Sequence, residues 1–111
     1  MKTPIQQIIF HASPEEGSFL NMLRPYRGLK EEIFLDLRTA LQQMEPEFKA
    51  AKKADKDLMS AIWTLCFSAK YWGTEPDSML VRNELITDAD RQTLRTWINE
   101  LSLMMATFLQ G

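Results

Sequence analysis

The chain has 111 residues, of which 45% are hydrophobic and 25% charged, and its formal net charge is −2 at pH 7. This length is typical of one compact domain, so we predict a single domain over residues 1–111. The single cysteine excludes an internal disulfide, and the single histidine excludes metal motifs that need two histidines. We therefore expect no metal site and no cofactor.

The charge balance and hydropathy also limit the partners. Binding to nucleic acid depends largely on Lys and Arg that neutralise phosphates, and a slightly acidic chain offers little of this attraction. No segment approaches the roughly 20 apolar residues of a membrane span, and the N-terminal segment lacks the apolar core of a secretory signal. We expect a soluble cytoplasmic protein that binds neither nucleic acid nor membrane.

Helix-start signatures recur along the chain. Each has a Ser or Thr that can cap a helix, followed after three positions by Gln, Glu or Asp. They are residues 3–6 (TPIQ), 13–16 (SPEE), 74–77 (TEPD) and 87–90 (TDAD). These signatures, with the helical spacing of the apolar residues, predict an all-α compact bundle of about five to six helices.

The apolar spacing also gives the expected helices in chain order. Three helices carry the core residues, and we expect them at about residues 29–45, 57–72 and 88–109. Three shorter helices are expected to cover this core, at about residues 4–12, 14–24 and 76–86. Pro46 is expected to end the first core helix. The helix over 57–72 is apolar on nearly all sides and leaves only a polar line at Ser60, Thr64 and Ser68, so we predict a central position for it.

The two residues best suited to nucleophilic catalysis lie in unfavourable settings. His11 lies two residues before the predicted Ser13 cap, which indicates a helix-end position at the surface. Cys66 lies among apolar residues, which raise the pKa of a thiol and make it inert. No serine has the local sequence of a nucleophile elbow. We therefore assign no catalytic residue, and the sequence favours a protein without enzymatic activity.

The predicted helices over 76–86 and 88–109 superficially resemble a helix-turn-helix. In that motif the N-terminal residues of the second helix enter the major groove. Here these residues include Asp88 and Asp90, which phosphates would repel. This observation supports the expectation of no nucleic-acid partner.

A cluster of polar residues suggests one possible ligand site. Arg24, Tyr26 and Arg27 place two guanidinium groups and a phenol in one turn before a predicted helix, and Arg82 lies at another helix end. Arg presents a planar fork to carboxylate or phosphate, so these residues could line a pocket for an anionic small molecule. Alternatively, the two arginines of the turn pair with neighbouring acidic residues or with helix carbonyls.

An excess of apolar residues suggests an interface. Leu103, Met104 and Leu109 leave little polar face at the end of the last helix, and Leu35 lies off the apolar face of its own helix. Either the N-terminal helix or another chain is expected to cover them. The leading hypothesis is a small non-catalytic helical interaction or regulatory module, self-associating as a possible homodimer. The alternative is a small-molecule- or anion-binding helical domain.

Overall fold

The computed structural model describes residues 3–26, 28–50, 56–75 and 78–110, with only the backbone at 47–50, 56 and 107–110. The fold is all-α, as predicted, and the described residues contain no β-strand. The elements in chain order are α1 (Pro4–His11), α2 (Phe19–Leu23), α3 (Glu31–Ala50), α4 (Lys56–Ala69), the π-helix η1 (Lys70–Thr74), α5 (Met79–Arg82) and α6 (Asp88–Gln110). No helix in these described ranges is long and apolar enough to cross a membrane.

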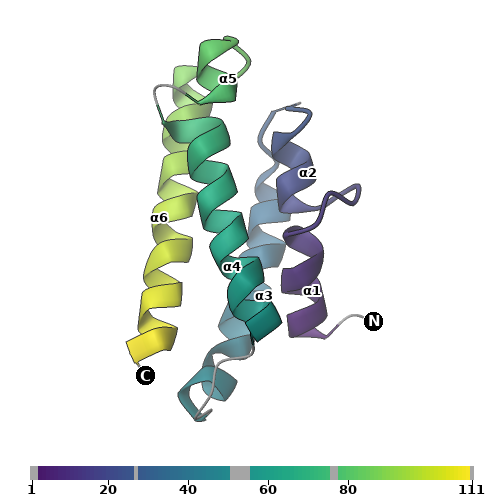
Figure 1. The fold of residues 1–111 in the computed structure, drawn as a ribbon, viewed down its shortest axis with the longest axis vertical. Coiled ribbons are helices and arrows are strands. Elements are labelled where there is room, and N and C mark those ends of the chain that lie inside the picture. Colours follow the sequence, from purple (N-terminus) through teal and green to yellow (C-terminus); the bar gives the residue numbers. More distant parts are fainter. Residues whose placement is uncertain (1–2, 27, 51–55, 76–77, 111) are drawn as a thin grey trace.

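The three long helices form an elongated bundle of 44 × 29 × 20 Å. In Figure 1, α4 runs upward at the front, between α6 on one side and α1 and α2 on the other, while α3 lies behind. Helix α6 runs in the direction opposite to α4 (Figure 1). The predicted core helices are thus confirmed, but one long face of α4 has no neighbouring helix in front of it.

Aromatic stacking holds α3 against α6. The rings of Phe34 and Trp97 are parallel within 2°, with centroids 4.7 Å apart. The ring of Phe19, from α2, lies 6.3 Å from that of Trp97. Pairs in this distance range contribute about 0.5–1.5 kcal/mol beyond the burial of their area. Trp97 therefore links three elements at one point of the core.

Two of the four predicted helix starts are confirmed. At α1, Thr3 Oγ1 accepts from the Gln6 N–H and the Gln6 side chain accepts from the Thr3 N–H, which completes a capping box. At α6, Thr87 Oγ1 accepts a hydrogen bond from the Asp90 N–H over 3.1 Å. Both hydroxyls satisfy a backbone donor that has no partner within the helix.

The predicted start of the second helix at Ser13 is wrong. Helix α2 begins at Phe19 with Ser18 as its N-cap, and Gly17 adopts a φ of +86° in the preceding turn. The Ser13 hydroxyl donates instead to the Phe10 carbonyl at the end of α1, over 2.6 Å. Ser13 is therefore used to end one helix, and α2 is only five residues long.

The predicted start at Thr74 is also wrong. Thr74 ends the π-helix, where its hydroxyl donates to the Lys70 carbonyl over 3.2 Å. Ser78 caps α5 in its place by accepting from the Val81 N–H. The sequence pattern alone did not show whether Thr74 or Ser78 caps the helix, because residues that can form a helix follow both of them.

Helix α3 continues through Pro46, where it was expected to end. A proline inside a helix removes one backbone hydrogen bond to the residue four positions earlier. Pro46 and Gln42 are both exposed, so water can satisfy the carbonyl that loses its partner.

Candidate functional site

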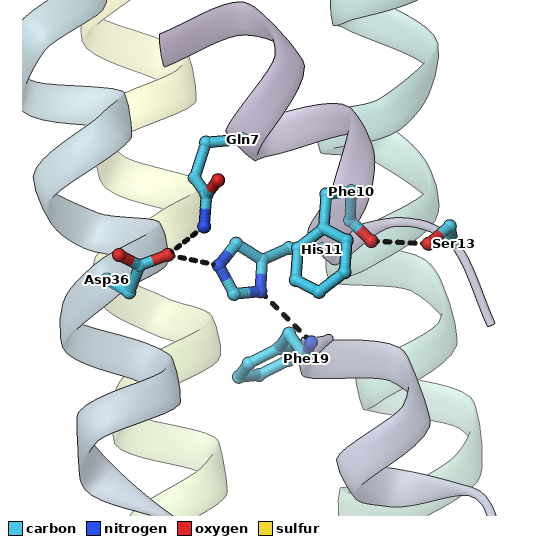
Figure 2. Close-up of polar contacts among 6 residues, drawn as sticks. All are labelled: Gln7, Phe10, His11, Ser13, Phe19 and Asp36. Atoms are coloured by element: carbon cyan, nitrogen blue, oxygen red, sulfur yellow. Dashed lines mark hydrogen bonds and ion pairs between the residues drawn. The ribbon is translucent and has the colours of Figure 1, made fainter. Parts of the chain in front are cut away.

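His11 is buried rather than on the surface, which contradicts the expectation from sequence. Its side chain lies between α1, α2 and α3 and the residue is only 1% exposed. Figure 2 shows Nε2 of His11 directed at Asp36 on α3, with a distance of 2.7 Å to Oδ2. Gln7, one helical turn earlier on α1, donates to the same carboxylate oxygen.

The contacts of His11 settle its role. Nδ1 accepts a hydrogen bond from the Phe19 N–H over 3.1 Å, so this nitrogen carries no proton. Nε2 then carries the proton and donates it to Asp36. Because both ring nitrogens are engaged, His11 cannot serve as a general base without breaking one of these bonds. The imidazole instead satisfies the first backbone N–H of α2.

The described residues of the suggested anion pocket, Arg24, Tyr26 and Arg82, lie in separate environments. The Arg24 guanidinium lies over the Trp72 ring, 5.5 Å from its centroid. The Tyr26 hydroxyl donates to Asp90 Oδ2 over 2.7 Å, so an anion beside it would approach a carboxylate. Arg82 is exposed at the end of α5, and Arg27 lies outside the described residues. The small-molecule hypothesis remains a prediction.

Two cavities lie elsewhere, and Arg24, Tyr26 and Arg82 line neither. One of about 170 Å³ separates the loop before α2 from the start of α3. The other, of about 240 Å³, lies between η1 and α6. In the second cavity, Lys70 Nζ lies 3.5 Å from Glu75 Oε1, and Arg95 donates to the Thr74 carbonyl over 3.4 Å. These cations therefore already have partners within the chain.

A metal centre finds no support in the described ranges. No group of three or more His, Cys, Asp or Glu residues there could hold a metal ion. Cys66 is a free thiol, and burial raises its pKa, an effect that a hydrogen bond with Ser102 partly opposes. A raised pKa lowers the thiolate fraction and therefore the nucleophilicity.

The predicted interface residues lie in different environments. Leu103 is exposed on α6, whereas Leu35 and Met104 are half-buried and pack against the core. The side chain of Leu109 lies outside the described residues. The exposed Leu103 is thus the member of this group that the structure leaves accessible.

The most unusual surface feature is a column of aromatic rings on α4 and η1, which the sequence reading did not identify. Trp63, Phe67 and Tyr71 occur at intervals of four residues and are 57%, 43% and 53% exposed. The Trp63 and Phe67 rings stack at 4.6 Å and 15°, and the Phe67 and Tyr71 rings lie 4.4 Å apart at 32°. Three adjacent aromatic side chains therefore face solvent.

The sequence did carry a signal for this column. We predicted a polar line at Ser60, Thr64 and Ser68 and a central position for this helix. Ser68 is buried, whereas the aromatic side chains of the column are exposed. The spacing of 63, 67 and 71 places these residues on one helix face. Apolar side chains on all sides of a helix do not reveal which side is covered, because that depends on where the other helices pack.

Leu103 belongs to the same face as the aromatic column. Helices α4 and α6 lie side by side, and Cys66 of α4 lies next to Ser102 of α6. Phe67 and Leu103 each follow one residue after this pair, and the two helices run in opposite directions (Figure 1). A step of one residue turns both side chains outward to the same side of the bundle. We refer to Trp63, Phe67, Tyr71 and Leu103 as the aromatic face.

The geometry of the column limits what can bind there. Phe67 has a neighbouring ring on each side, and Trp63 and Tyr71 each have one ring face beside Phe67. A nucleic-acid base or a sugar needs a free ring face on which to stack. Residues 58–69 include no charged residue, so this part of the surface attracts neither anions nor cations. Aliphatic and aromatic side chains of a protein suit such a surface best.

Comparisons with protein-family models, with curated proteins and with solved structures give no match for this chain. The chemistry of the aromatic face is therefore the basis for assigning a function.

Proposed function

We propose that this protein is a small non-catalytic helical interaction module that self-associates through its aromatic face. The observation that carries the proposal is the exposed column of Trp63, Phe67 and Tyr71, which Leu103 extends onto α6. Aromatic residues are enriched in the cores of protein interfaces, where charged residues are depleted.

The exposed apolar area suits a protein contact. Three half-exposed aromatic side chains and one leucine offer on the order of 400 Å² per copy. Monomeric proteins rarely expose a contiguous apolar patch larger than a few hundred Å². A pair of such faces, with their neutral polar neighbours, would bury on the order of 1,000 Å², near the lower limit for a specific interface. We expect a dimer with a dissociation constant on the order of tens of micromolar.

A second copy of the chain suits this surface, because an uncharged apolar face can pack against an identical face. Between Asp57 and Lys70 the α4 segment carries no charge, so two copies can approach without like-charge repulsion. A contact made by the same patch on both chains is also the commonest arrangement of soluble homo-oligomers.

The state of the candidate nucleophiles supports the absence of catalysis. Both nitrogens of His11 are hydrogen-bonded, to Asp36 and to the Phe19 N–H. The pKa of the Cys66 thiol is raised by burial. The His11 imidazole therefore has no free nitrogen to act as a base, and the Cys66 thiol has a reduced thiolate fraction.

Sedimentation velocity between about 1 and 500 µM tests self-association over the range in which the dimer should form. We expect the weight-average mass to rise with concentration for the wild type, and Leu103→Glu to weaken this rise. Leu85 is also exposed but lies before α6 and outside the aromatic face, so Leu85→Glu is the matched control and should associate like the wild type. A wild type that stays monomeric throughout, or equal effects of the two variants, would contradict the proposal.

A further inference from the structure

We infer that the self-association is an antiparallel pairing of two α4 helices about a two-fold axis at Phe67, in which Trp63 of one copy packs against Tyr71 of the other. This inference rests on the proposed function and specifies the arrangement of the two copies. It follows from the spacing, the register and the hydrogen-bonding chemistry of the aromatic face.

The spacing of the column is symmetric about its centre. Trp63 and Tyr71 lie four residues before and after Phe67, and their ring centroids lie 4.6 Å and 4.4 Å from that of Phe67. A two-fold axis that passes through Phe67 at right angles to α4 therefore brings Trp63 of one copy level with Tyr71 of the other. The same operation brings the two Phe67 side chains together.

The hydrogen-bonding groups favour this antiparallel arrangement over a parallel one. The indole N–H of Trp is a donor only, whereas the hydroxyl of Tyr can accept as well as donate. An antiparallel pair sets a Trp63 donor opposite a Tyr71 acceptor at both ends of the contact. A parallel pair would set two Trp63 side chains opposite each other, with two donors and no acceptor. The dipoles of two antiparallel helices also attract each other.

The flanking residues fit the same axis. Leu103 is 70% exposed and lies nearly level with Phe67, because each follows directly after one of the neighbouring residues Ser102 and Cys66. Two copies related by the axis therefore bring their Leu103 side chains close to the centre of the contact. Lys70 directly precedes Tyr71, and its Nζ lies 3.5 Å from Oε1 of Glu75 in the same chain. The two lysines thus add little net repulsion.

Complementary charges provide the test. Trp63 and Tyr71 are more than half exposed, so Trp63→Lys and Tyr71→Glu should fold like the wild type, which circular dichroism and urea unfolding would check. Each variant alone places two charges in the contact, and we expect its self-association to weaken by at least about tenfold. In an equimolar mixture, one Trp63–Tyr71 pair stays intact and the other becomes a Lys–Glu pair. We expect association of the mixture within about threefold of the wild type.

The matched control is a mixture of Trp63→Lys with Tyr71→Lys, in which the facing charges repel and association should stay weak. If wild type associates but the Lys–Glu mixture associates no better than the Lys–Lys mixture, the antiparallel pairing is wrong while the proposed function stands. If the wild type is monomeric at all concentrations, the proposed function and this inference are both wrong. Native mass spectrometry of the mixtures distinguishes the mixed dimer from the two homodimers by mass.

Discussion

His11 and Asp36 join α1 to α3 across 25 positions of the sequence, through a contact of 2.7 Å between Nε2 and Oδ2. The same imidazole receives the Phe19 N–H at the start of α2. One buried side chain thus holds three helices in register. Loss of this side chain should therefore lower the free energy of unfolding.

The two hydrogen bonds of His11 should contribute unequally to the free energy of unfolding. Asp36 is half exposed and also receives Gln7, whereas the Phe19 N–H is buried and would lose its acceptor. His11→Asn keeps an acceptor near the position of Nδ1, and His11→Gln keeps a donor near that of Nε2. We expect both variants to be less stable than the wild type. The free energy of unfolding of His11→Gln should be about 1–2 kcal/mol below that of His11→Asn.

Urea unfolding at pH 7.5 measures this difference, with His11→Ala as the reference that lacks both groups. A variant series in which Gln is as stable as Asn, or more stable, would show that the bond to Asp36 dominates instead.

Tyr26 should make the protein less stable in alkaline solution. Burial raises the pKa of its phenol, and the hydrogen bond and negative charge of Asp90 raise it further, well above the usual value of about 10. Between the usual pKa and the raised one, the unfolded chain loses a proton that the folded chain keeps. The contribution of Tyr26 to stability is therefore complete below about pH 10 and declines as the pH rises above it.

Tyr71→Phe leaves Tyr26 as the one tyrosine of the chain, so tyrosinate absorbance reports on it alone. We expect its titration to be displaced to higher pH in the folded state and to move toward the ordinary value in urea. Tyr26→Phe should remove part of the loss of stability above about pH 10. The same titration in folded and unfolded protein would show that neither burial nor Asp90 raises the pKa of Tyr26.

Gly73 should be intolerant of a side chain, because it lies where η1 approaches α6 closely. A Cβ atom at Gly73 would overlap Cδ2 of Leu94, which is fully buried. We expect Gly73→Ala to lower the free energy of unfolding by about 1–3 kcal/mol, as in other overpacked cores. Leu94→Ala alone opens a cavity, and the double variant should be more stable than the sum of the two effects predicts. Strict additivity in urea unfolding would show that this contact is not the cause.

Cys66 should react slowly with thiol reagents in the folded protein. Burial raises its pKa, so less thiolate is present at a given pH than for a free thiol. At pH 8 we expect reaction with Ellman's reagent to be at least about tenfold slower than in urea, where the cysteine becomes exposed. Equal rates under both conditions would mean that the thiol is accessible and not perturbed.

Local patterns account for most of the fold that could be predicted. The cap at Thr3 and the start of α6 after Thr87 depend on neighbouring residues alone, because the hydroxyl and the N–H that it satisfies lie within one turn. The false starts at Ser13 and Thr74 have the same local pattern. Their hydroxyls instead donate to carbonyls at the ends of the preceding helical segments. A pattern of residue types does not show whether a hydroxyl ends one helix or begins the next.

The sequence by itself determined the all-α class, the three core helices and the lack of a second histidine or cysteine, because composition and helical spacing are properties of the chain. Only the tertiary structure decided which side of each helix is covered. It buried His11 against Asp36, and it left Trp63, Phe67 and Tyr71 in solvent on a helix that is apolar nearly all round. The hydrophobic effect requires apolar area to be covered but does not specify by which element. That choice, made by the packing of α1, α3 and α6 around α4, produced the face on which the proposed function rests.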